Sequence, residues 1–124
     1  MKKIMVVEDS PAMRGLIASI LGQIEDIEVI EAENGYDALR RLPREAVDLI
    51  ITDINMPDIN GLELLSFVRK SPSLAQTPVI IVTTEASEQD RKRAQALGAN
   101  SYVTKPFKPE QLLAAAQQLL GGAA

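Results

Sequence analysis

Residues 4–11 read Ile4-Met5-Val6-Val7-Glu8-Asp9-Ser10-Pro11, and this stretch contains both a strand and the start of a helix. Its first four residues are all apolar, which is typical of a short strand that is covered on both faces of a sheet. Two acids end the apolar run. Ser10 is a favourable N-cap and Pro11 suits the first helical position, so a helix should begin directly after the acids.

Similar strand and helix patterns alternate along the rest of the chain. Strong apolar runs at 49–51 and 79–82, and weaker ones at 28–31 and 101–104, predict four more strands. Apolar residues at helical spacing predict five helices, which begin near Pro11, Gly35, Gly61, Ser87 and Pro109. The second should reach about Leu42 and the last about Leu120, and Gly98 should end the fourth in a left-handed conformation.

The helical spacing also predicts which side chains are buried. In the first helix one apolar face contains Met13, Leu16, Ile17, Ile20 and Leu21. The inward residues of the second, third and fifth helices are Ala38, Leu39, Leu42, Leu62, Leu65, Val68, Leu112, Leu113, Ala116, Leu119 and Leu120. The fourth helix should instead present a solvated face made of Glu88, Asp90, Arg91, Lys92 and Arg93.

Five strand–helix units in succession predict an α/β fold, namely a doubly wound, five-stranded parallel sheet with helices on both faces. The 124 residues fit one compact domain, and neither a linker nor an internal repeat divides them. We therefore expect a single domain over residues 1–124.

The composition excludes several classes of function. The chain has no cysteine and no histidine, which removes disulfides, thiolate metal sites and the commonest general base. Its net charge of −4, without a basic stripe or an aromatic platform, argues against nucleic-acid binding. No run approaches the ~20 apolar residues that span a bilayer, and Glu8-Asp9 interrupts the first run too early for an export signal. We expect a cytoplasmic protein that does not bind a membrane.

Acidic residues follow two of the predicted strands. Glu8 and Asp9 come directly after the first apolar run, and Asp53 follows the run at 49–51. In an open parallel sheet, ligands bind outside the carboxyl ends of the strands, and these three acids should meet there. Two like charges ~4 Å apart repel by ~4 kcal/mol at a protein-surface dielectric, so the cluster needs a cation or raised pKa values.

The other strand ends carry groups that suit phosphoryl transfer. Oxygen ligands without histidine or cysteine favour Mg²⁺, which shares its coordination with phosphate oxygens. Thr83 ends the fourth predicted strand with a hydroxyl donor, and Lys105 follows the fifth with a positive charge. A carboxylate nucleophile, a metal and donors for the phosphoryl oxygens are the components that phosphoryl transfer needs.

Four segments of the chain resemble the signature segments of response-regulator receiver domains, in the same order and at matching spacing. They are Val6-Val7-Glu8-Asp9-Ser10, Thr52-Asp53-Ile54-Asn55-Met56-Pro57 with Gly61, Val82-Thr83-Thr84-Glu85-Ala86, and Lys105-Pro106-Phe107. The resemblance covers essentially the whole length and is strongest to stand-alone, chemotaxis-type (CheY-like) regulators. It implies a flavodoxin-like fold with the strand order 2-1-3-4-5.

The resemblance also implies roles for the clustered residues. Asp53 would accept a phosphoryl group from a phosphohistidine of a partner histidine kinase. Asp9, Asp53 and the backbone carbonyl of Asn55 would bind Mg²⁺, while Glu8 would act mainly through water. Lys105 would pair with the phosphoryl group and Thr83 would donate a hydrogen bond to it.

Further residues match family positions that concern switching and signal lifetime. Tyr102 matches the aromatic switch residue that turns inward as Thr83 moves. Asn55 and Glu85 lie where receivers tune their own dephosphorylation. Glu8 stands where many members have Asp, which bears on metal geometry rather than on phosphorylation. The resemblance also favours a cis peptide bond between Lys105 and Pro106, against a general cis frequency of only ~5–6%.

The last predicted helix indicates where a target would bind. It carries no charge from Gln111 to Leu120, whereas receivers of transcription factors often dimerise through charged pairs in this region. We therefore expect a monomer whose downstream target protein binds the face around Tyr102 and the last helix.

Two alternatives to a stand-alone switch remain. The chain could be the receiver of a larger hybrid kinase or DNA-binding regulator, although Met1 begins the first strand almost at once and no linker follows the last helix. It could also be an aspartyl-phosphate phosphohydrolase. Such enzymes usually carry a second acid shortly after the nucleophile as general acid, and Asn55 cannot serve in that way. The chain is therefore predicted to be a phosphoacceptor that assists its own phosphorylation and dephosphorylation, rather than an enzyme.

Overall fold

The computed structural model describes residues 1–84 and 87–122. Strands and helices alternate through this part of the chain, and every predicted element is present. The strands are β1 Lys2–Val7, β2 Ile27–Ala32, β3 Leu49–Thr52, β4 Val79–Thr83 and β5 Ser101–Thr104. The helices are α1 Pro11–Leu21, α2 Gly35–Arg41, α3 Gly61–Lys70, α4 Glu88–Ala96 and α5 Pro109–Gln117.

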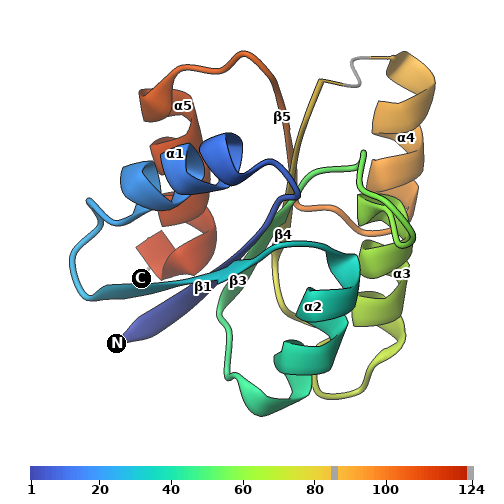
Figure 1. The fold of residues 1–124 in the computed structure, drawn as a ribbon, viewed down its shortest axis with the longest axis horizontal. Coiled ribbons are helices and arrows are strands. Elements are labelled where there is room, and N and C mark those ends of the chain that lie inside the picture. Colours follow the sequence, from blue (N-terminus) through green and yellow to red (C-terminus); the bar gives the residue numbers. More distant parts are fainter. Residues whose placement is uncertain (85–86, 123–124) are drawn as a thin grey trace.

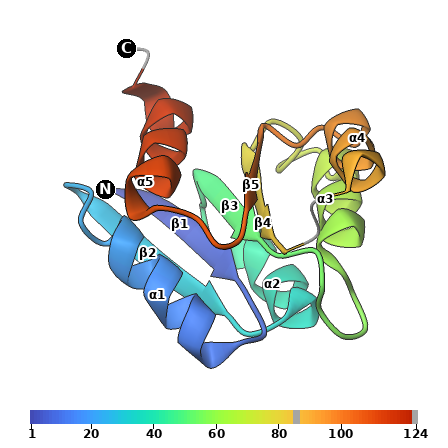
Figure 2. The same cartoon turned by 90° about the horizontal axis from the view of Figure 1, so that it is seen from above.

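The strands form one parallel sheet in the order β2-β1-β3-β4-β5, so both the predicted fold class and the strand order are confirmed. Helices cover both faces (Figure 1): α1 and α5 lie together on one side, and α2, α3 and α4 lie on the other. Figure 2, turned by 90°, shows the sheet between these two layers.

Each face of the sheet has its own hydrophobic core. Ile4, Val6, Ile51 and Ile80 point to the side of α1 and α5, and Met5, Val7, Ile50 and Ile81 point to the side of α2, α3 and α4. This alternation buries both faces of β1, β3 and β4, which explains why their apolar runs are continuous in the sequence.

The helix ends follow the expected local chemistry. Ser10 caps α1 by accepting a hydrogen bond from the backbone of Met13, with Pro11 as the first helical residue. Asn60 and Glu63 form a reciprocal capping box at the start of α3. Gly98 follows α4 with φ +99°, the predicted left-handed conformation.

Two helices end differently from the expectation. The α-helix that was predicted to reach Leu42 stops at Arg41 and continues as a tighter turn over Leu42–Arg44. Pro43 has no backbone N–H to donate to the preceding turn, which accounts for the early end. The last helix is regular to Gln117 and continues as a wider turn over Gln118–Gly122, in which Gly121 has φ +100°.

The predicted burial of Leu16 is wrong, because half of this residue is exposed. Ile17, Ile20 and Leu21 are buried and Met13 is half-buried, so the centre of the covered face lies near Ile17. Leu16 lies at the edge of this stripe, where the neighbouring elements do not reach it. Within the described residues, no helix is long and apolar enough to cross a bilayer.

Candidate functional site

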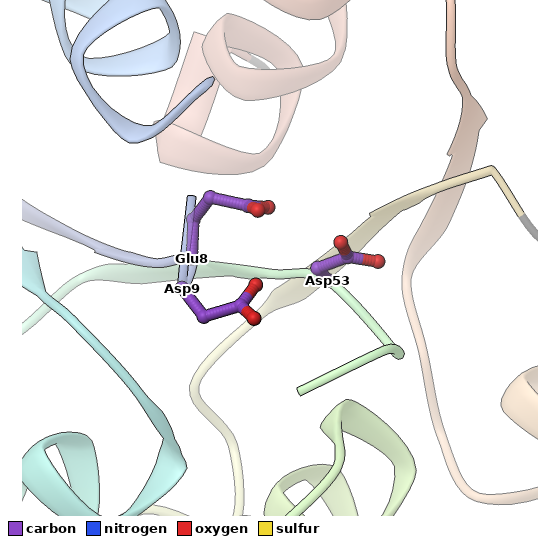
Figure 3. Close-up of side chains that lie close together, drawn as sticks. All are labelled: Glu8, Asp9 and Asp53. Atoms are coloured by element: carbon purple, nitrogen blue, oxygen red, sulfur yellow. The ribbon is translucent and has the colours of Figure 1, made fainter. Parts of the chain in front are cut away.

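The parallel register aligns the carboxyl ends of the central strands. Val7, the last residue of β1, is paired with Thr52, the last residue of β3. Glu8, Asp9 and Asp53 therefore leave the sheet side by side, and each offers a carboxylate oxygen within 4.8 Å of the other two. Figure 3 shows the Glu8 and Asp9 side chains extending toward the side on which Asp53 lies. The predicted acidic cluster is present, and it could hold a metal ion.

The three acids differ in exposure. Glu8 is 2% exposed and Asp53 is 7% exposed, whereas Asp9 is open to solvent. An open depression of ≈ 450 Å³ lies beside them and is lined by Asp9, Ile54, Asn55, Met56, Pro57 and Asn60. The cluster therefore has a closed inner side at Glu8 and a mouth at Asp9.

The backbone around Asp53 is held tightly. Its N–H donates to the carbonyl of Val7, and the N–H of Asn55 donates to its Oδ1. Gly61 lies against the peptide of Asp53, where an added Cβ would be 2.0 Å from the carbonyl oxygen. The N–H of Gly61 also donates to the carbonyl of Ile54 at 3.0 Å. Only glycine allows this close approach, so Gly61 fixes the loop that carries Asp53.

Lys105 completes the inner side of the cluster. Its Nζ lies 2.9 Å from Oδ2 of Asp53 and 3.1 Å from Oε2 of Glu8. Its backbone N–H donates to the carbonyl of Thr83 at 2.8 Å, which joins the ends of β4 and β5. The Lys105–Pro106 bond is cis, as expected. The contact with Glu8 was not predicted, because no local pattern relates two residues 97 positions apart.

Burial and charge shift the protonation of the cluster. Burial raises the pKa of the Glu8 carboxyl group; hydrogen bonds from Lys105 and from the Ser10 backbone partly oppose this, and the charge of Asp53 adds to it. Burial alone would lower the pKa of Lys105, but its hydrogen bonds to Asp53 and Glu8 outweigh that effect and raise it. One ammonium group faces three carboxyl groups, so the ionised cluster keeps an excess of negative charge that favours a divalent cation.

Three of the remaining predicted residues fall within the described part of the chain. Thr83 is fully buried at the end of β4, and Asn55 is exposed at the mouth. Tyr102 lies on the edge strand β5, half-buried against the core beneath α4. Glu85 is outside the described residues.

Two arginines near the site were not predicted to contact its residues. Arg14 of α1 donates from Nη1 to the backbone carbonyl of Glu8 at 2.8 Å and pairs through Nε with Glu31 at 3.3 Å. Arg91 was expected on the solvated face of α4, and this is wrong: it is half-buried, with its guanidinium carbon 4.6 Å from the centre of the Tyr102 ring. The sequence offers one indication of a role for Arg14: it is an isolated cation at the start of α1.

Residues 4–117 match the family model of the response regulator receiver domain. The chain belongs to this family. It is 40% identical over 120 residues to the chemotaxis protein CheY homolog of Campylobacter jejuni, covering 96% of this chain and 92% of that protein. The resemblance inferred from the four signature segments is thus confirmed for the family.

Solved receiver structures share the fold. Chemotaxis protein CheY4 of Vibrio cholerae superposes with a TM-score of 0.88 at 34% identity, covering 96% of this chain and 98% of that one. The phosphorylated cyanobacterial phytochrome response regulator RcpA gives a TM-score of 0.87 at 30% identity, covering 99% and 96%. The protein is thus a CheY-like receiver of two-component signalling, a class of signalling switches that histidine kinases phosphorylate and that act on target proteins.

Proposed function

We propose that Asp53 accepts a phosphoryl group from the phosphohistidine of a partner histidine kinase, in a reaction that depends on Mg²⁺. The observation that carries this proposal is the Asp53 carboxylate itself, which accepts a hydrogen bond from the backbone N–H of Asn55 and contacts Lys105, while two further acids offer oxygens within 4.8 Å. A carboxylate oxygen would attack phosphorus and form an acyl phosphate. The bond between phosphorus and the donor nitrogen would break, and the imidazole would leave with that electron pair and take a proton from solvent.

Each residue of the cluster has its own role in this proposal. Asp9, Asp53 and the backbone carbonyl of Asn55 would hold Mg²⁺, with Glu8 acting through water. The ion would supply positive charge for the phosphoryl oxygens. Lys105 can exchange its contact with Asp53 for one with the phosphoryl group, because its ammonium is a flexible point charge. Thr83 would donate its hydroxyl hydrogen bond to the same group, while Asn55 and Glu85 would tune its hydrolysis.

The phosphorylated chain would then change its affinity for a target protein. We propose that residues 1–124 act as a monomeric receiver in the cytoplasm, and that Tyr102 and the part of α5 after Glu110, which carries no charge, form the target face. The similarity to CheY proteins supports a role in chemotaxis or motility. Asn55 occupies the place where a phosphohydrolase would need its second acid, so we do not propose that activity.

Intact mass spectrometry after treatment with acetyl phosphate tests the central step. The parent should gain one phosphoryl group with Mg²⁺ present and lose this reactivity when EDTA removes the ion. Asp53→Asn should gain none. Asp58→Asn is the matched control, because Asp58 has φ +66°, a conformation that asparagine tolerates, and it is an exposed residue of the same loop. Phosphorylation of Asp53→Asn to the same extent as the parent would refute the proposal.

A further inference from the structure

The helix α4 carries three consecutive basic residues, and one of them differs from the others in burial. Lys92 and Arg93 are exposed, whereas Arg91 is half-buried and turns toward β5. Its guanidinium lies over the face of the Tyr102 ring, 4.6 Å from the ring centre. Its Nη2 also donates a long hydrogen bond of 3.5 Å to the hydroxyl of Thr104. Arg91 therefore contacts two side chains of the strand that leads directly to Lys105.

The chemistry of the contact is attractive. A guanidinium within about 6 Å of a ring centre is drawn to the negative face of the ring, and its planar shape allows it to stack there. A half-buried position strengthens this attraction, because less water competes for the cation. Tyr102 is also packed against the core beneath α4. The ring is thus held between that core and the arginine.

The contact accompanies a direct ion pair between Lys105 and Asp53, an arrangement that we take as the resting conformation. In the same structure Lys105 bonds directly to Asp53 and Glu8, in the place where a phosphoryl group would intervene. We propose that Arg91 is a positioning residue that holds Tyr102 in this resting conformation, so that the ring must leave the guanidinium when the protein switches. This inference rests on the proposed function, since it takes Tyr102 as the residue that moves upon phosphorylation.

Arg91 would set how far a given degree of phosphorylation shifts the two-state equilibrium of Tyr102. Loss of one partly exposed cation–π contact corresponds to a change of about two- to fivefold in the ratio of displaced to resting conformers. Arg91→Gln should raise the ratio by that factor. Arg91→Lys keeps the charge and loses the planar stack, so it should give a smaller rise.

The first measurement concerns the unphosphorylated protein. The chain has two tyrosines and no tryptophan, so a Tyr36→Phe background leaves Tyr102 as the one tyrosine reporter for NMR. In this background Arg91→Gln should shift the Tyr102 ring signals. The matched variant Arg93→Gln removes the same charge from an exposed position of α4 and should leave them unchanged. Unchanged Tyr102 signals in Arg91→Gln, or equal shifts in both variants, would overturn the proposal.

The second measurement follows the same signals after treatment with acetyl phosphate and Mg²⁺, with the phosphorylated fraction read by intact mass. At equal phosphorylation, Arg91→Gln should show a displaced-to-resting ratio about two- to fivefold above that of the parent and of Arg93→Gln. Equal ratios in all three proteins would overturn the role of Arg91 alone. A parent that gains no mass would overturn the proposed function and the regulatory part of this inference, whereas the first measurement would still report the stacking contact.

Discussion

The ion pairs at Lys105 and those along α2 join the same kinds of side chain at different depths. The side chains of Lys105, Asp53 and Glu8 are 10%, 8% and 3% exposed, with N–O distances of 2.9 and 3.1 Å. The surface network runs from α2 to the start of β1 through distances of 2.6 to 3.9 Å, and its side chains are 15% to 68% exposed. Its members are Asp37, Arg40, Arg41, Glu45 and Lys3.

Depth decides what each group of charges can do. Water and salt screen the network along α2, so each of its pairs contributes at most about 1 kcal/mol to stability. At Lys105 the carboxyl groups of Glu8 and Asp53 are shielded from water, and together with the exposed Asp9 they outnumber the one cation. The unbalanced charge of this cluster therefore attracts a cation strongly, which is the property that the proposed metal and phosphoryl site requires.

The largest expected effect on stability concerns the tightly packed backbone beneath Asp53, compared with an open position on the surface. Gly61→Ala would place a Cβ 2.0 Å from the carbonyl oxygen of Asp53, and neither backbone can move away cheaply. We expect the free energy of unfolding to fall by about 3 kcal/mol or more. Gly15 in α1 is the control, since an added Cβ meets nothing within 4 Å. Gly15→Ala should raise stability by about 0.5–1 kcal/mol through helix propensity.

Urea unfolding followed by circular dichroism measures both changes. If Gly61→Ala unfolds at the same urea concentration as the parent, then the loop can relax and Asp53 is not held as tightly as its contacts indicate.

Lys105 and Lys3 give the next comparison. Lys105 pairs with Glu8 and Asp53 at the carboxyl ends of the strands, and Lys3 pairs with Glu45 near the start of β1. Lys105→Met would leave Glu8 and Asp53 facing each other without a cation, and should lower stability by about 1–3 kcal/mol in metal-free solution at neutral pH. Lys3→Met removes a pair whose side chains are about 30% exposed, and should change stability by less than about 0.5 kcal/mol. Equal effects in urea unfolding would show that depth does not separate the two groups.

The sequence predicted the components of the site better than their contacts. Asp53, the two acids after β1 and Lys105 each follow a predicted strand, and the rule that ligands bind at the carboxyl ends of parallel strands brings them together without further information. The glycine at position 61 is recognised from its family match, but the reason for it is a tertiary contact: a Cβ added there would lie 2.0 Å from the carbonyl oxygen of Asp53.

Lateral packing accounts for what the sequence did not predict. Helical spacing assigns Leu16 to an apolar face, yet it does not tell how wide a stripe the neighbouring elements cover. In the same way, Arg91 lies in a run of charges that is typical of a solvated face, and only the position of β5 beside α4 brings it onto Tyr102. Contacts between elements thus decide the details that periodicity leaves open.

The smallest expected effect concerns Asp37, which lies in the surface network at the start of α2. Burial alone would raise the pKa of its carboxyl group, but hydrogen bonds from Arg40 and from the Glu33 backbone, together with the charges of Arg41 and Arg40, hold that pKa below the ordinary value of 3.8. A lowered folded-state pKa means that the ionised form stabilises the fold above the ordinary value. This contribution is then lost as the pH falls through the lowered value.

Asp37→Asn should therefore cost a few tenths of a kcal/mol at neutral pH, because the pairs are exposed to water. The deficit should disappear in acid once the Asp37 carboxyl of the parent is itself protonated. It should also shrink in about 1 M salt, which screens the pairs with both arginines. Urea unfolding of the parent and the variant at neutral pH and in acid, at low and high salt, measures the stability deficit under each of these conditions. A deficit that persists unchanged in acid would come from the Asn34 cap or the Glu33 turn at the start of α2, and the charge of Asp37 would then not be its cause.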